Sequence, residues 1–179
     1  MHYGMRPQEE SRSSMSYNTD YDIYSLHISK NESRPGCLLG VISSLSENAN
    51  NNLEVVEMNM NDAEISQKDT MIIKYPASKI MWSPVAPSYG QDNQLIAVTS
   101  DKLRLYNYSQ QGRIEARKEL KNTLLNDLSA PLTSFDWSEQ KNYICCSSID
   151  TTCSIFDINE EKFYKQLIAH DKEVNCLSI

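Results

Sequence analysis

Three thiols in the C-terminal part of the chain, at Cys145, Cys146 and Cys153, are the first residues that could bind a metal or carry redox chemistry. Zinc sites usually contain cysteines at Cys-x-x-Cys spacing, and that spacing occurs nowhere in the chain. Cys145 and Cys146 are neighbours in a β-type run, so their side chains point to opposite faces and cannot share one ion. The pattern favours small buried thiols, with no metal and no cofactor.

A general base with carboxylates is the second chemistry to consider, with His170, Asp150 and Asp157 as candidates. Each aspartate occupies a turn or a strand end, and neither a Ser-His-Asp arrangement nor a glycine-rich phosphate loop accompanies them. Trp82 and Trp137 stand at matching places in two repeats, which favours core packing over a cofactor box. Structural roles are therefore the favoured interpretation, and we expect a protein that is not an enzyme.

The elements that position these residues follow a repeat of 50 positions. Three hexapeptides at 53–58, 103–108 and 153–158 share the order apolar, polar, apolar, apolar, polar, apolar. On an extended chain this order gives each face of the strand two apolar side chains. A strand of this kind packs between neighbours on both sides, as in a stack of small sheets.

Short β-type runs alternate with turn-forming clusters from residue 21 onward, four in each repeat. Good helix formers make a helix over 113–128 the strongest alternative, but the matching segments of the other repeats are β-rich. The predicted strands are 22–28, 37–42, 53–58, 71–75, 79–82, 95–99, 103–108, 113–120, 132–137, 143–147, 153–158 and 163–168.

Composition excludes several classes of protein. The net charge is −7 and the sequence pI is near 5.0, so we expect no direct nucleic-acid binding through phosphate contacts. Mean hydropathy is −0.53, and no apolar stretch approaches the ~18 residues that would predict a membrane span. The first ten residues lack the apolar core of a signal peptide, so we expect the five cysteines in a reducing compartment.

Two repeats carry a hydroxyl, a turn aspartate and an aromatic residue in the same order, with the aspartate five residues before the aromatic in one repeat and six in the other. This arrangement resembles the WD repeat. In that family a Ser or Thr, an Asp and a Trp form a buried hydrogen-bonded network with a His. Tyrosine and phenylalanine replace the usual Trp here, and no His precedes the second or third repeat. The residues that the resemblance assigns to such structural roles are Thr99, Asp101, Tyr106, Ser148, Asp150, Phe156, Asp157 and His170.

The segments 130–137, 147–153 and 166–174 look like one WD-repeat subfamily, and 75–82 is similar to it. This subfamily comprises the plant transparent-testa-glabra regulators and the animal cullin-ligase-associated adaptors that hold dual-specificity tyrosine-regulated kinases. The resemblance implies a non-enzymatic seven-bladed propeller that docks kinases or transcription factors in the cytoplasm and nucleus. A substrate adaptor of a cullin-type ubiquitin ligase is an alternative. The usual docking signature, Trp-Asp-x-Arg, is replaced by 156–159, which ends in Asn.

The predicted organisation is a disordered polar tail (1–20), blade 1 (21–75), blade 2 (76–129), blade 3 (130–168) and the start of a truncated fourth blade (169–179). Closed propellers need ~4 to 8 blades, so we expect an incomplete propeller with two uncovered blade faces that could associate.

That organisation leaves two interpretations open. The chain is part of a longer product or of a two-chain propeller, or else it is a vestigial fragment without a function of its own. Partner-binding residues cannot be assigned by pattern. Tyr89, Gln91 and Asp92, in the long loop after Trp82, are the candidates.

Overall fold

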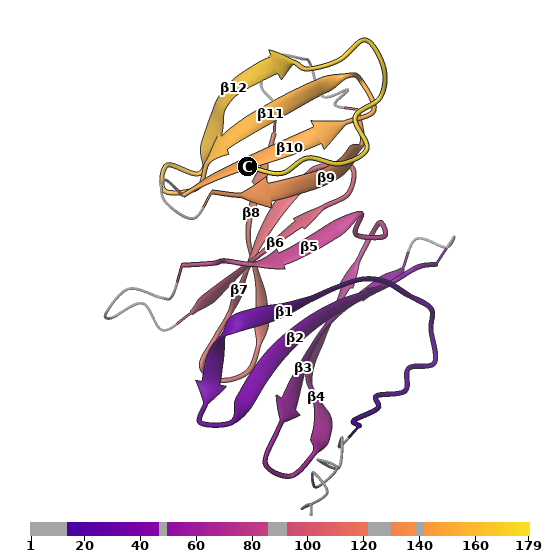
Figure 1. Cartoon of the computed structure of the whole chain (residues 1–179), viewed down its shortest axis with the longest axis vertical. Helices are drawn as coiled ribbons and strands as arrows, with labels where there is room; N and C mark the ends of the chain where they lie inside the picture. The colour runs from indigo at the N-terminus through magenta and orange to yellow at the C-terminus, as the bar shows by residue number, and fades with distance from the viewer. Residues whose placement is uncertain (1–13, 47–49, 86–92, 122–129, 139–141) are drawn as a thin grey trace, which may run out of the picture.

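The computed structural model describes residues 14–46, 50–85, 93–121, 130–138 and 142–179. Within these ranges the backbone forms twelve strands, arranged as three four-stranded antiparallel sheets (Figure 1). The described part of the chain contains no helix, and so none that could cross a membrane. The predicted all-β fold of three successive blades is confirmed.

Each sheet is a meander whose strands pair in chain order. Blade 1 contains β1 (Ile23–Arg34), β2 (Cys37–Ser44), β3 (Asn51–Asn59) and β4 (Glu64–Ile73). Blade 2 contains β5 (Lys79–Trp82), β6 (Gln94–Thr99), β7 (Leu103–Tyr108) and β8 (Ile114–Leu120). Blade 3 contains β9 (Leu132–Trp137), β10 (Tyr143–Ser148), β11 (Thr152–Asp157) and β12 (Lys162–Ile168).

The repeated hexapeptides place their apolar residues on both faces of β3, β7 and β11. Leu103 and Leu105 pack in the core between blades 2 and 3, while Tyr106 and Tyr108 pack in the core between blades 1 and 2. The equivalent residues of the third hexapeptide divide in the same way, since Phe156 packs toward blade 2 and Cys153 lies on the opposite face. The doubly buried strand predicted from the repeat is therefore present.

β1 and β4 are the strands that differ most from their predicted extent, since β1 continues to Arg34, beyond the predicted 28. β4 begins at Glu64, well before the predicted 71, because the polar run 64–70 pairs with the second half of β3. Apolar periodicity gives no signal for such a polar outer strand. The helix considered over 113–128 is wrong for Ile114–Leu120, which pairs with β7 as a strand; residues 122–128 lie outside the described residues.

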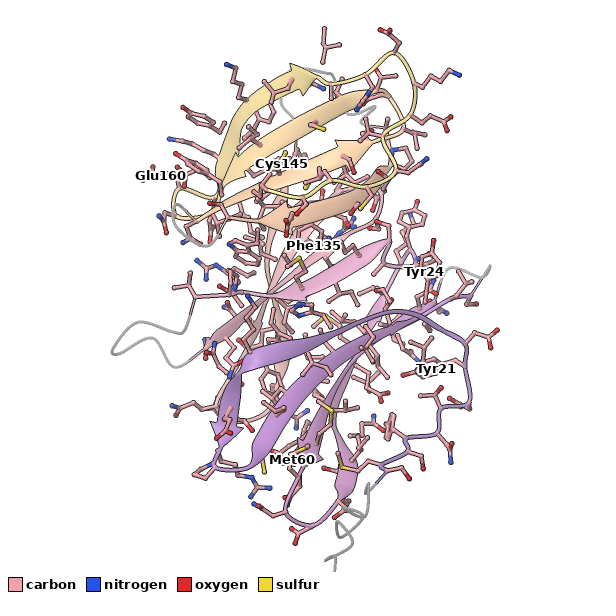
Figure 2. The ribbon with its side chains drawn as sticks, in the orientation of Figure 1. Tyr21, Tyr24, Met60, Phe135, Cys145 and Glu160 are labelled. Atoms are coloured by element: carbon pink, nitrogen blue, oxygen red, sulfur yellow. The ribbon has the colours of Figure 1, made fainter. Side chains whose placement is uncertain are left out.

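The structure differs from the predicted polar tail at residues 14–20, which lie extended against blade 1. Tyr17 and Tyr21 donate hydrogen bonds to Glu54 on β3, over 2.5 and 2.9 Å. Figure 2 shows Tyr21 on the segment that runs beside blade 1. Glu54 lies on the face of β3 opposite Leu53 and Val55, which pack against blade 2. This face is therefore partly covered, although Leu26 on β1 remains 57% exposed.

Residues 169–179 form no strand, although their alternating pattern predicts the first strand of a fourth blade. They lie across the face of blade 3 that points away from blade 2, where Val174 is buried against Cys145 and Cys153. The Thr133 hydroxyl donates to the Val174 carbonyl. The segment forms no ladder, but the backbone N–H of Val174 bonds to the Ser148 carbonyl (3.3 Å) and that of His170 to the Thr151 carbonyl (3.3 Å).

Candidate functional site

The first strands of the three blades, β1, β5 and β9, lie next to one another (Figure 1). They frame a cavity of about 460 Å³. Because each blade contributes its first strand, this cavity lies where the blades converge. Its walls combine two tryptophans with ionisable groups from different blades. The lining residues are His27, Lys30, Met81, Trp82, Ser83, Pro84, Asp136, Trp137, Ser138 and Ile179.

His27 joins blade 1 to blade 2 at this cavity. Its Nδ1 atom accepts a hydrogen bond from the backbone N–H of Trp82, over 3.1 Å. Accepting through Nδ1 requires the neutral ring, with its proton on Nε2. Burial lowers the pKa of His27, and the charges of Lys79 and Lys30 lower it further. The imidazole is therefore a structural acceptor in its neutral form.

Trp82 fills the junction behind the cavity wall and is 2% exposed. Its ring meets that of Tyr108 edge to face, with centroids 5.8 Å apart. Its indole Nε1 is a buried donor without a hydrogen-bond partner among the described residues. Unpaired buried donors are rare and cost free energy. Trp82 Nε1 is therefore an unsatisfied hydrogen-bond donor beside the cavity.

Asp136 on β9 holds the C-terminal segment at the third wall of the cavity. Its Oδ2 accepts from the backbone N–H of Ile179 (2.9 Å) and from the Ser178 hydroxyl (3.1 Å), while Oδ1 accepts from the Trp137 N–H (2.9 Å). Although burial alone would raise the pKa of Asp136, these hydrogen bonds lower it. Both carboxylate oxygens are thus engaged, which suits binding and positioning rather than proton transfer.

The predicted turn residues of blade 3 form a compact local network. The Oδ1 atom of Asp150 accepts from the N–H of Thr152 (3.0 Å) and from its hydroxyl (2.7 Å). Ser148 donates its hydroxyl to the Pro131 carbonyl (3.1 Å) and accepts from the Asp150 N–H (3.3 Å). Thr151, between the two bonded residues, has a φ of 76°. The aspartate therefore fixes the β10–β11 turn, as its side chain favours.

The predicted residues of blade 2 are arranged differently. Arg104 forms two bonds to Asp101, over 2.6 and 3.2 Å, and the Ser100 hydroxyl donates to the same carboxylate. Burial alone would raise the pKa of Asp101, but these hydrogen bonds lower it. Tyr106 lies 5% exposed in the core, where burial raises the pKa of its hydroxyl. An ion pair thus occupies the turn.

Sequence reasoning missed Ser78, which ties the start of blade 2 to blade 3. Its hydroxyl lies 3.0 Å from Thr99 Oγ1 and 2.8 Å from the Leu132 carbonyl. Thr99 Oγ1 also lies 3.4 Å from the Lys79 carbonyl, which makes a weak bond. Ser78 directly precedes the first strand of its blade, where the WD pattern has a histidine, and that position was the available signal.

His170, to which the resemblance assigns a structural role in a further repeat, lies in the segment after β12. Its side chain is exposed, and only its backbone N–H bonds, to the Thr151 carbonyl over 3.3 Å, within the described residues. Phe156 is buried between blades 2 and 3. Asp157 accepts from the Glu160 N–H (3.0 Å), and so closes the β11–β12 turn. Tyr89, Gln91 and Asp92 lie outside the described residues.

The thiols lie on both faces of blade 3, as expected. Cys146 packs toward blade 2, whereas Cys145 and Cys153 pack on the opposite face. Burial, together with the nearby Cys153, raises the pKa of Cys145 to about 11. Among the residues that the structure describes, no three His, Cys, Asp or Glu side chains form a group that could hold a metal ion.

Three stacked four-stranded blades with hydroxyl and aspartate turns are consistent with the blades of an incomplete WD-repeat propeller. The chain is 36% identical over 166 residues to the DDB1- and CUL4-associated factor 7 homolog of Dictyostelium discoideum, covering 92% of this chain. It is also 36% identical over 143 residues to a WD repeat-containing protein of Schizosaccharomyces pombe, and 33% identical over 153 residues to one of Saccharomyces cerevisiae. These homologues support the WD repeat-containing protein family for this chain.

The chain spans 50% of the Dictyostelium protein, 33% of the Schizosaccharomyces protein and 28% of the Saccharomyces protein. The matches to the Schizosaccharomyces and Saccharomyces proteins each cover 74% of this chain. No family model matches it. The similarity therefore supports the WD-repeat class for the part of its relatives that this chain spans.

Proposed function

We propose that these three blades belong to a non-enzymatic scaffold that binds other proteins. The fold supplies rigid sheets joined by turns, and its first strands converge on a cavity lined by Trp82, Trp137, His27 and Asp136. The hydrogen-bonding atoms of His27 Nδ1 and Asp136 are engaged within the chain, so the cavity offers aromatic and polar surface rather than a poised acid and base. Such a surface suits recognition.

The observation that carries this proposal is the similarity, over 92% of the chain, to a protein named for its association with DDB1 and CUL4. We propose that the protein containing these blades associates with DDB1 and CUL4, as an adaptor of a cullin-type ubiquitin ligase. The turn at 156–159 is not the proposed contact, because Asp157 closes its own turn and Asn159 accepts from the Asn142 amide over 2.6 Å.

The clients of the scaffold follow from the subfamily resemblance. Dual-specificity kinases and transcriptional regulators are the two classes that the segments 130–137, 147–153 and 166–174 imply. We propose that the protein docks one of these classes, in the cytoplasm and the nucleus. Neither class requires a cofactor or nucleic-acid contact from these blades.

Co-elution of purified proteins on a sizing column tests the proposal. The full chain is mixed with purified DDB1–CUL4 complex, and separately with a dual-specificity tyrosine-regulated kinase or a DNA-binding transcription factor. We expect co-elution with DDB1–CUL4 and with one client class. Lys30→Glu, which reverses a charge on the cavity wall, tests the cavity, and Lys165→Glu on exposed β12 is its matched control. Co-elution with none of these proteins overturns the proposed function.

A further inference from the structure

Residues 14–21, which we call the N-terminal strap, lie against blade 1 without joining its sheet. Among the described residues, no backbone–backbone hydrogen bond involves 14–20. Asp22 is fixed instead, because its carbonyl accepts from the Leu45 N–H over 2.9 Å. Segments with few backbone hydrogen bonds open at low cost in free energy. Side chains therefore hold the strap, which opens about a hinge at Asp22.

The side chains of the strap alternate between solvent and blade 1. Residues 14, 16, 18 and 20 are exposed, whereas 15, 17, 19 and 21 are partly buried. The hydroxyls of Tyr17 and Tyr21 donate to the two carboxylate oxygens of Glu54 on β3, over 2.5 and 2.9 Å. The Thr19 hydroxyl bonds within the strap, to the Tyr21 carbonyl. The two phenols thus connect the strap to the blade.

The face of blade 1 under the strap is largely apolar. Strand pairing sets Leu26, Ile42 and Glu54 in one row across β1, β2 and β3, and Ile28 and Val56 belong to the next row on the same face. Ile42 and Val56 are buried, whereas Leu26 and Ile28 are exposed. Since its phenols reach Glu54, the strap covers the middle of this face and leaves the margin on β1 open.

Glu54 receives neutral donors only, within the part of the chain that the structure describes. Three hydroxyls surround it, from Tyr17, Tyr21 and Thr70. No Lys, Arg or His of the described residues forms an ion pair with it. Burial and the Glu54 carboxylate raise the pKa of Tyr17 to about 12, so its phenol stays protonated near pH 7. A second negative charge here would meet the carboxylate without a compensating cation from these residues.

We propose that Tyr17 is a phosphorylation site for a tyrosine kinase, and that its phosphorylation releases the N-terminal strap from blade 1. The Tyr17 oxygen attacks the γ-phosphorus of ATP, and the bond from that phosphorus to the β–γ bridging oxygen breaks. The phenolic proton passes to a carboxylate of the kinase, and ADP leaves. Tyr17 lies far enough from the hinge at Asp22 to enter a kinase site, whereas Tyr21 adjoins it.

Release follows from the chemistry of the phosphate. A phosphotyrosine carries between about 1.5 and 2 negative charges at pH 7, and beside a carboxylate it acts by repulsion. The modified Tyr17 oxygen also has no hydrogen to donate to Glu54. Both effects oppose docking of the strap, and its opening exposes Ile42 and Val56. The inference concerns regulation of this face and does not depend on the proposed partners.

Treatment of the full chain with ATP and a panel of purified tyrosine kinase domains tests the site. The free peptide 14–22 is the reference substrate, and peptide mass spectrometry locates the phosphate. Because opening of the strap is inexpensive, the folded chain should be phosphorylated at Tyr17 within about tenfold of the rate of the peptide. A panel that modifies Tyr17 in neither substrate, or only in the peptide, would overturn the inference.

Nuclear magnetic resonance of the phosphorylated chain tests the release. The heteronuclear NOE of amides 15–20 reports motion on the picosecond to nanosecond timescale. It should fall to the values of a free chain after phosphorylation, and recover after treatment with a tyrosine phosphatase. Fluorescence of a bound anilinonaphthalene dye should rise with release, because Ile42 and Val56 become accessible. Unchanged NOE values with Tyr17 phosphorylated would contradict the proposed release.

Two comparisons separate the charge of Glu54 from other effects. Phosphoserine introduced at Ser16 is the matched control, because this neighbour of Tyr17 is exposed and faces away from Glu54. It should leave the strap docked. Glu54→Gln keeps an acceptor oxygen but removes the charge, so phosphorylation of Tyr17 should release a smaller fraction of the strap. Circular dichroism confirms folding. Equal release by phosphoserine at Ser16, or undiminished release in Glu54→Gln, would refute repulsion by Glu54.

Discussion

Tyr21 donates its phenolic hydrogen to Oε2 of Glu54 over 2.9 Å and joins the chain before β1 to the middle of β3. Tyr17 donates to the other oxygen of the same carboxylate, and the Thr70 hydroxyl lies 3.3 Å from Oε2. Glu54 is 4% exposed, so these bonds replace most of its hydration. A carboxylate buried in this way depends on its donors.

Replacing both phenols with phenylalanine tests that dependence. Tyr17→Phe together with Tyr21→Phe should lower the free energy of unfolding by about 2 kcal/mol, because a buried carboxylate loses two donors. Hydrogen exchange of amides 15–22 should accelerate. Tyr24→Phe is the control, since Tyr24 is 51% exposed and has no side-chain hydrogen bond among the described residues. Equal urea midpoints for the double variant and the unmodified chain would contradict the prediction.

Acidification should destabilise the chain through His27. Burial lowers its pKa in the folded state, so the stability that it contributes is complete above the unfolded pKa of ~6.5 and is lost as pH falls through the lower folded value. The free energy of unfolding should therefore decrease between pH 7 and the acidic range. His27→Asn keeps an acceptor for the Trp82 N–H and should flatten this dependence.

Denaturant unfolding measured at several pH values checks the His27 prediction. His170→Asn is the matched control, because the His170 side chain is exposed. A pH dependence of stability that survives in His27→Asn but disappears in His170→Asn would show that it comes from His170, and would contradict the prediction.

The turn between β10 and β11 should be sensitive to Asp150. Asp150→Ala removes the acceptor of two bonds from Thr152 and should lower the free energy of unfolding by about 1 to 2 kcal/mol. Asp171→Ala, at an exposed position, should change it by less than about 0.5 kcal/mol. Urea unfolding of the two variants compares them directly, and equal losses would refute a specific role for Asp150.

Thr151 should be replaceable with a gain in stability. Its φ of 76° lies in the left-handed region, where a β-branched residue is strained. Thr151→Gly should raise the free energy of unfolding by about 1 kcal/mol, and Thr151→Asn by less, because Asn tolerates this conformation better than Thr. Thermal unfolding ranks the three proteins, and a lower midpoint for glycine than for threonine would contradict the strain.

Alkylation should distinguish the five cysteines. Cys176 is exposed, whereas the other four are buried, and burial raises the pKa of Cys145 to about 11. At pH 8 only about one thousandth of Cys145 is thiolate, the reactive form. Iodoacetamide should therefore label Cys176 first, as followed by peptide mass spectrometry. Rapid labelling that persists in Cys176→Ser would show that a buried thiol is reachable.

Periodicity predicted the strands because it depends on local alternation. β5, β7 and β9 begin and end at their predicted residues, since each is a short apolar run bounded by turn residues. The first half of β4 was not predicted because it is polar. It is a strand because it pairs with β3, and its own sequence carries no apolar alternation. The WD resemblance placed Asp150 in its turn, but did not anticipate the ion pair of Asp101 with Arg104.

The features that sequence reasoning missed join residues far apart in the chain. Glu54 meets Tyr21 across 33 positions, His27 meets Trp82 across 55, and Ser78 meets Leu132 across 54. A single sequence carries no signal for such pairs, because each residue is locally an ordinary strand or loop residue. The cavity at the first strands depends on such distant contacts, and so it could not be predicted.

The outer strand of blade 2 shows how this fold stays separate from its copies. Between the buried residues Ile114 and Leu120, β8 exposes Glu115, Arg117, Lys118 and Glu119 in close succession. An unpaired strand edge is a template for cross-β aggregation, and a second strand added here would have to accommodate these charges. These charged side chains thus act as gatekeepers against fibre growth.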